Sequence, residues 1–190
     1  IGLERLREYI QEKGLSFTES MEIVRSSSLF TTHTPVPAGH DAFSTDMLGK
    51  YIGHFAEKLK IDWHTLMSLG MVDPYNNNEK FSMSNLAANL SQEVNGVSWL
   101  HGKVSQDILA YLWPGYLPEE LHVSYVTNGV HYPTWTAPEW KEVHAKVFGE
   151  AFASHHYDRS CFSGIRKVSN EEIWKIRCTL KTKLIDKVKE

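Results

Sequence analysis

A histidine in a proline-rich loop is the residue of this chain that most clearly could do chemistry. A β-branched run ends at His33, and Pro35 and Pro37 then constrain the backbone of a polar turn that extends to residue 41. Because proline also restricts the residue before it, Thr34 should be extended and His33 should be held in place. A strand that ends in this way can deliver a histidine into a cleft, or it can carry a histidine with a purely structural role.

Two more polar turns contain asparagine and glycine: Asn95-Gly96, and residues 127–129 around Asn128. Each pair by itself predicts only a tight turn. Their position after strand-like or helix-breaking segments indicates more, because ligands of open α/β folds collect at the carboxyl ends of strands. Histidine and asparagine suit the hydroxyl groups of a sugar, since both donate and accept hydrogen bonds without a fixed charge.

Other mechanistic signatures are absent from the sequence, which has no Walker-type phosphate loop, G-x-G-x-x-G, G-x-S-x-G or H-E-x-x-H motif. We expect no metal site, because a proline-rich loop separates His33 from His40, and the adjacent His155 and His156 would point in different directions. The 2 cysteines form no C-x-x-C pair and are too few for a disulfide framework, which favours a cytoplasmic location.

The composition limits size and partners. A chain of 190 residues that is 42% hydrophobic can bury one sizeable core, which predicts one domain or a large piece of one. A formal net charge of -3 provides no basic field for nucleic acid, and no apolar run approaches the roughly 18 residues that a membrane span needs. Because the chain begins at Ile1 already in helical register, we expect it to be a piece of something longer.

Hydrophobic periodicity predicts helices alternating with two short strands, which is an α/β pattern. The least patterned stretch, residues 153–163, is a candidate boundary. The expected elements are a helix ending at Gly14, a helix after the capping box Ser16–Glu19, a strand over 29–32, a helix over 44–59, a helix from Asp62 to about Gly70, a loop over 73–78, a helix after Ser82, a longer helix from Val97 to Leu112, a strand over 121–126 and a final helix after Ser169.

Three ordered blocks resemble the α-glucan (glycogen/maltodextrin) phosphorylases, and most closely the bacterial type. The blocks are residues 32–41 (THTPVPAGHD), 94–98 with 100–102 (VNGVS and LHG), and 126–131 with 134–135 (VTNGVH and TW). The resemblance runs from about Leu15 to the final helix. It implies that residues 1–190 are part of the N-terminal, glucan-binding half, a Rossmann-like half of a glycosyltransferase B fold that is rich in helices.

The family transfers a terminal α-1,4-glucosyl unit to inorganic phosphate and releases α-glucose 1-phosphate. The resemblance therefore implies α-1,4-glucan and phosphate as partners and pyridoxal phosphate as the cofactor of the full-length parent. The cofactor would be bound by the other half, which this chain lacks, so the fragment alone should be inactive. A homo-oligomeric parent is compatible with the family, and the sequence leaves the oligomeric state open.

Residue roles follow from the resemblance, position by position. His33 would hydrogen-bond the 6-hydroxyl of the glucosyl unit, with its backbone carbonyl near the anomeric centre, where a dipole can stabilise developing positive charge. Asn128 would bind the same 6-hydroxyl region, and Val94 would form a wall of the subsite. His101 should serve packing or a backbone hydrogen bond, whereas Gln106 stands where the bacterial pattern has arginine, which leaves its role open.

Two alternatives stay open at this point. One is a non-catalytic glucan-binding or regulatory module on the same scaffold, and a lysine motif for the cofactor downstream would argue against it. The other is a sugar-nucleotide glycosyltransferase with two domains, for which dependence on a nucleotide rather than on phosphate would be the test.

Overall fold

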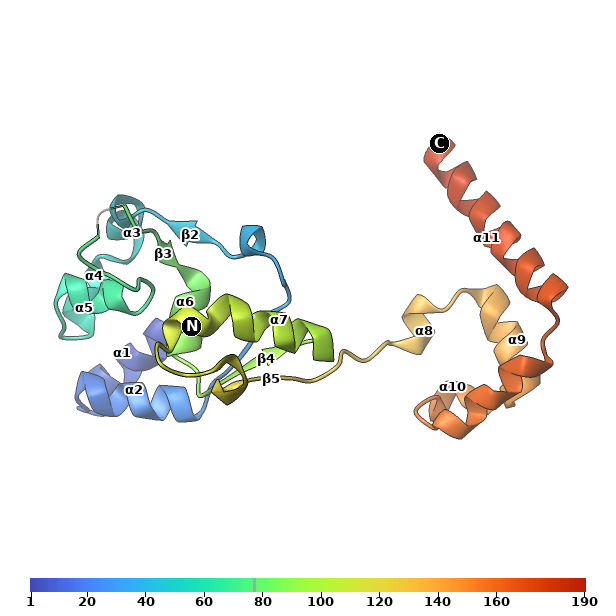
Figure 1. The fold of residues 1–190 in the computed structure, drawn as a ribbon, viewed down its shortest axis with the longest axis horizontal. Coiled ribbons are helices and arrows are strands. Elements are labelled where there is room, and N and C mark those ends of the chain that lie inside the picture. The colour runs from blue at the N-terminus through green and yellow to red at the C-terminus, as the bar shows by residue number, and fades with distance from the viewer. Residues whose placement is uncertain (77) are drawn as a thin grey trace. The chain divides into compact units, whose positions relative to one another are not determined.

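The computed structural model describes residues 1–76 and 78–190, so the predicted loop over 73–78 lies in part outside the described residues. The chain forms two compact units, Ile1–Asn128 and Gly129–Glu190 (Figure 1). The boundary predicted in the stretch 153–163 is therefore wrong. Aromatic rings explain why: Phe152 packs on Phe148 and Phe162, with ring centroids 4.6 Å and 5.5 Å apart, so this stretch belongs inside the second unit.

The first unit opens with two packed helices, α1 (Gly2–Glu12) and α2 (Phe17–Ser26). Gly14 follows α1 with a φ of 72°, the left-handed conformation that ends helices. The predicted capping box at the start of α2 is confirmed: the Ser16 side chain accepts from the Glu19 N–H, and the Glu19 carboxylate accepts from the Ser16 N–H. The Ser16 hydroxyl also donates to the Glu19 carboxylate at 2.6 Å, and this bond, followed by the bond from the Ser16 N–H, holds the pKa of Glu19 below its ordinary value.

A parallel sheet of three strands forms the centre of the first unit, in the order β1 (Leu29–Thr31), β4 (Glu93–Gly96), β5 (Val123–Tyr125). In register, Phe30 lies beside Val94, and Val94 lies beside Val123. The parallel strands and the helices between them confirm the predicted α/β class.

A second, antiparallel pair of strands was not expected from the sequence: β2 (Ala42–Phe43) and β3 (Phe81–Ser82), each of two residues. The helix predicted over 44–59 is also wrong in detail, because it is broken into α3 (Thr45–Ile52) and α4 (His54–Lys58) at Gly53. The turn there is so tight that a β-carbon on Gly53 would lie 2.5 Å from the carbonyl oxygen of Gly49.

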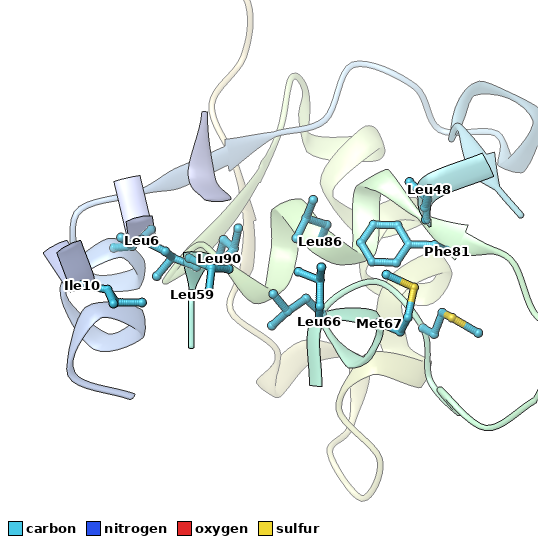
Figure 2. Packing of buried hydrophobic residues seen from close by; sticks show 12 residues of the cluster. Leu6, Ile10, Leu48, Leu59, Leu66, Met67, Phe81, Leu86 and Leu90 are labelled. Carbon is cyan, nitrogen blue, oxygen red and sulfur yellow. The ribbon is translucent and has the colours of Figure 1, made fainter. Parts of the chain in front are cut away.

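The other elements of the first unit complete its two cores. They are η1 (Pro37–Gly39), α5 (Trp63–Ser68), α6 (Met83–Asn89), α7 (Trp99–Leu109), η2 (Ala110–Leu112) and η3 (Pro118–Glu120). The larger core includes Leu6, Leu66 and Phe81 (Figure 2). The smaller one lies against the sheet and contains Ala88, Val94, Leu109, Leu121 and Val123.

The second unit is helical among its described residues. It contains α8 (Tyr132–Trp135), α9 (Pro138–Phe148), α10 (Phe152–His155), η4 (Arg159–Lys167) and α11 (Asn170–Lys189). Ser169 caps α11 as predicted, because its side chain accepts from the Glu172 N–H. No helix in the described part of the chain has both the length and the apolar character to cross a membrane.

Candidate functional site

The parallel sheet brings all three polar turns to one edge. β1 leads into His33, β4 ends at Gly96, and β5 leads towards Asn128, and parallel strands end at a common side of the sheet. Hydrogen bonds continue past the strands. The Thr32 N–H donates to the Asn95 carbonyl at 3.0 Å, and the Asn128 N–H donates to the Val97 carbonyl at 3.0 Å. The three segments singled out from the sequence therefore form one contiguous edge.

His33 is exposed, whereas Thr32, the residue before it, is 4% exposed. The imidazole makes no hydrogen bond to any described residue, so its two ring nitrogens are available to a ligand. The Thr32 hydroxyl points along the loop and approaches the Thr34 carbonyl at 3.5 Å. His33 is thus held by backbone on its strand side while its ring stays free, which does not fit a histidine that only satisfies the core.

The far end of the histidine loop is anchored to helix α6. Nδ1 of His40 lies 2.6 Å from the Ser84 hydroxyl, and the Met83 N–H donates to the Asp41 carbonyl at 2.9 Å. At Gly39 the loop folds back so tightly that a β-carbon would lie 2.1 Å from a methyl of Thr34. The loop that carries His33 is therefore fastened at both ends.

Asn128 is exposed and is the last residue of the first unit. Because β4 lies between β1 and β5, the two strands that lead to His33 and Asn128 are two interstrand steps apart, or about 10 Å. A sugar ring with its hydroxyl groups can be reached from both sides of such a gap.

Val94 does not offer surface in this structure. Its side chain is 1% exposed and packs in the core beside Val123 and Leu109. Its predicted role as a wall of the subsite stays a prediction. Asn95 is also buried, at 7% exposure, in keeping with a residue that shapes the turn.

Two glycines let the helix after β4 approach the sheet. A β-carbon on Gly96 would lie 2.7 Å from the Gly102 nitrogen, and one on Gly102 would lie 3.0 Å from the β-carbon of Tyr125. Helix α7 therefore rests directly on the ends of β4 and β5, and the backbone at the edge of the sheet is held closely.

Two residues of α7 with undecided roles now have contacts. The His101 ring accepts a hydrogen bond from the Val97 N–H at 3.2 Å, which confirms the expected backbone bond. Gln106 donates from its side-chain amide to the carbonyl of Val123 at 2.9 Å, so it ties α7 to β5. A neutral amide does this without the charge that an arginine would bring.

Sequence reasoning missed the anchors His40 and Ser84. His40 was considered only as a metal ligand, yet it bonds a serine that is 44 residues away in the chain. The available signal was the glycine before it: Gly39 marks a tightly packed turn, and a histidine that directly follows such a turn is held in place and can make a fixed hydrogen bond. Among the residues that the structure describes, no three His, Cys, Asp or Glu side chains gather as a metal site would need.

Comparison with known proteins identifies the family of the chain. The family model described as "Carbohydrate phosphorylase" matches residues 2–190. The chain is 36% identical to a glycogen phosphorylase of Mycobacterium tuberculosis (strain ATCC 25618 / H37Rv), over 100% of this chain and 22% of that protein. It is 34% identical to a maltodextrin phosphorylase of Thermococcus litoralis, over 99% of this chain and 22% of that protein.

A glycogen phosphorylase of Aquifex aeolicus is 31% identical over 94% of this chain and 25% of its own length. The chain therefore belongs to the carbohydrate phosphorylase family, which agrees with the resemblance carried by its three sequence blocks. It spans about a fifth of the length of the first curated relatives that it matches.

Proposed function

We propose that this chain forms the glucan-binding side of a phosphorylase active site. In the full-length protein that site would transfer a terminal α-1,4-glucosyl unit to inorganic phosphate and release α-glucose 1-phosphate. The observation that supports this most strongly is the shared edge of β1, β4 and β5, where His33 and Asn128 present neutral hydrogen-bonding side chains. Membership of the family supports the reaction type.

His33 and Asn128 would bind and orient the sugar. Their uncharged donors and acceptors match hydroxyl groups, because a sugar hydroxyl both gives and accepts hydrogen bonds. The bond between C1 of the glucosyl unit and the O4 of the next unit breaks, a bond from C1 to a phosphate oxygen forms, and O4 takes up a proton. Positive charge develops at C1, and the backbone carbonyl of His33, fixed by the loop anchors, would stabilise that charge as a dipole.

The residues at this edge do not fit pyridoxal phosphate. Residues 31–41, 94–98 and 126–128 contain no lysine to bond its aldehyde and no arginine to hold its phosphate. We infer that the cofactor is held by another part of the parent protein, and no step described here passes through it. A cytoplasmic location, a homo-oligomeric parent and the inactivity of the isolated chain are part of the same proposal.

The test uses the longest natural protein that contains these residues. Incubated with maltodextrin and phosphate, it should release glucose 1-phosphate, and His33→Ala and Asn128→Ala should each lower kcat/KM by about 10- to 100-fold, as expected when hydrogen bonds to a substrate hydroxyl are lost. Release that is absent while the protein carries its cofactor would favour the non-catalytic module. Release that requires a nucleotide instead of phosphate would favour a sugar-nucleotide transferase.

A matched control is His64→Ala. This histidine lies in α5, outside the three segments of the candidate site, and stacks on Tyr75, with ring centroids 4.7 Å apart. Its removal should leave phosphorolysis unchanged, so that a general effect of losing a histidine can be separated from the loss of His33.

A further inference from the structure

The buried imidazole of His101 is connected to Asn128 by two successive hydrogen bonds. Nδ1 of His101 accepts from the Val97 N–H at 3.2 Å, and the Val97 carbonyl accepts from the Asn128 N–H at 3.0 Å. Val97 follows directly after β4, so the residue that makes both bonds lies at the edge where β1, β4 and β5 end, which forms the floor of the candidate site.

The position of the ring is well determined. His101 lies in the first turn of α7 and is 6% exposed, and its backbone N–H donates to the Ser98 hydroxyl at 3.2 Å. Since Nδ1 accepts a hydrogen bond, the neutral imidazole carries its proton on Nε2. Nε2 is buried and has no hydrogen-bond partner among the described residues. The hydrogen bond that the ring makes is therefore directed at the floor of the site.

Asn128 depends on this floor. It is exposed and lies three residues beyond the end of β5, where the ladder between β4 and β5 has ended. Two backbone bonds return its segment to the sheet: the Val126 N–H donates to the Gly96 carbonyl at 3.0 Å, and the Asn128 N–H donates to the Val97 carbonyl at 3.0 Å. Val97 in turn cannot move freely, because Gly96 and Gly102 are in close backbone contact and the His101 ring holds the Val97 N–H.

We propose that His101 is a positioning residue that sets the place of Asn128 in the sugar subsite through the backbone of Val97. His101 touches no substrate. Its effect is on recognition of the 6-hydroxyl group that Asn128 would bind, so it determines part of the preference for a glucosyl unit over the analogue that lacks this hydroxyl. The inference rests on the function proposed above.

The acceptor atom separates this role from simple packing. An asparagine at position 101 would place its amide oxygen close to where Nδ1 now accepts, and a leucine would fill similar space without an acceptor. If His101 only packs, leucine should be the better replacement. If His101 positions Val97, asparagine should be.

The experiment compares His101→Asn, His101→Leu, Asn128→Ala and the double variant His101→Leu/Asn128→Ala in the longest natural protein that contains these residues. Glucosyl transfer to maltodextrin is measured with α-glucose 1-phosphate and with its 6-deoxy analogue. The ratio of kcat/KM for α-glucose 1-phosphate to that for the 6-deoxy analogue measures recognition of the 6-hydroxyl. We expect His101→Leu to lower this ratio about 10-fold, the size of one hydrogen bond. His101→Asn should keep the ratio within about 3-fold of the wild-type value. The double variant should have the ratio of Asn128→Ala.

Ser105→Ala is the matched control. Ser105 lies one turn further along α7, is 2% exposed, and its hydroxyl has no hydrogen-bond partner among the described residues. It is as buried as His101 but lacks the bond to Val97, so its removal should leave the ratio unchanged. His101→Gln, whose amide reaches past the Nδ1 position, replaces His101→Leu if the leucine variant does not fold.

Three results would overturn the inference: an unchanged ratio in His101→Leu, an asparagine variant no better than leucine, or losses that multiply in the double variant. Amide hydrogen exchange at Asn128 keeps the inference distinct from the proposed function. Exchange should be faster in His101→Leu than in the wild type and in His101→Asn, whether or not the protein transfers glucosyl units. If the wild type transfers no glucosyl units but the variants show this exchange pattern, the phosphorylase proposal is refuted and the role of His101 in holding Asn128 is supported. If exchange at Asn128 is equal in all variants, that role of His101 is refuted.

Discussion

Alanine at position 96 should destabilise the first unit by disturbing the contact between α7 and the sheet. The added β-carbon would lie 2.7 Å from the nitrogen and 2.8 Å from the α-carbon of Gly102. Both are backbone atoms and cannot rotate away, so the helix as a whole has to shift. Overpacking of this kind costs about 1–3 kcal/mol, and two backbone contacts below 3.0 Å place Gly96→Ala at about 3 kcal/mol.

Two other glycines make this a graded test. On Gly102 a β-carbon would be 3.0 Å from the Tyr125 β-carbon and 3.1 Å from the Ser124 carbonyl oxygen, a strain of about 1 kcal/mol that the helix propensity of alanine largely offsets. Gly49 lies within α3 and is exposed, and a β-carbon there would have no other atom within 4 Å. Gly49→Ala should therefore stabilise the chain by about 0.5–1 kcal/mol.

Urea unfolding of the three variants at 25 °C, followed by far-UV circular dichroism, measures these free energies. The expected order of stability is Gly49→Ala above the wild type, Gly102→Ala close to it, and Gly96→Ala well below it. Two results would contradict this expectation: a free energy of unfolding for Gly96→Ala within about 0.5 kcal/mol of the wild type, or a larger loss of stability in Gly102→Ala than in Gly96→Ala.

Three more outcomes are expected from the structure. Phe81→Ala removes a fully buried ring, at 0% exposure, from the larger core and should cost about 3–5 kcal/mol in urea unfolding. Ser16→Ala removes the cap of α2 and should cost about 1 kcal/mol. It should also weaken the loss of stability below pH 4.5, because the bond from the Ser16 hydroxyl, the largest cause of the lowered pKa of Glu19, is gone while the bond from the backbone N–H remains. Burial lowers the pKa of His144 below 6.5, and its Nδ1 lies 3.1 Å from the Tyr132 hydroxyl. The unfolded state therefore binds more protons than the folded state as pH falls through 6.5, and thermal stability of the second unit should drop over that interval.

Each of these expectations has a control. Leu184→Ala, at a side chain that is 65% exposed, should change stability by less than about 0.5 kcal/mol, and an equal loss there would undermine the Phe81 argument. Ser26→Ala, at the other end of α2, should keep the acid transition of the wild type. His144→Phe should flatten the pH profile near 6.5, whereas His156→Gln tests the second histidine of the same ring cluster, which stacks on Tyr132. A profile that survives in His144→Phe and disappears in His156→Gln would show that the wrong histidine was chosen.

Local pattern was enough to predict most helix starts and the class of fold. Ser16, Asp62, Ser82 and Ser169 each accept a hydrogen bond from the N–H three residues later, and such caps depend only on neighbours in sequence. The strand at β1 was also predicted. Local pattern failed at Gly53, because the helical spacing of apolar residues continues across the point where α3 ends and α4 begins. It also failed at β2 and β3, which are two residues long each and form only because residues 42–43 pair with residues 81–82.

The candidate site shows the same division between local and distant information. The amino-acid sequence determined which residues could bind a sugar, since the side-chain chemistry of His33 and Asn128 and the turn-forming Asn-Gly pairs are properties of the residues themselves. Only the tertiary structure decided that three segments from residues 32 to 128 share one edge, because strand order depends on packing between distant parts of the chain. It also decided that Val94 lies in the core, that His40 bonds the Ser84 hydroxyl and that His101 bonds the Val97 N–H, because the partners of these side chains are set by the fold.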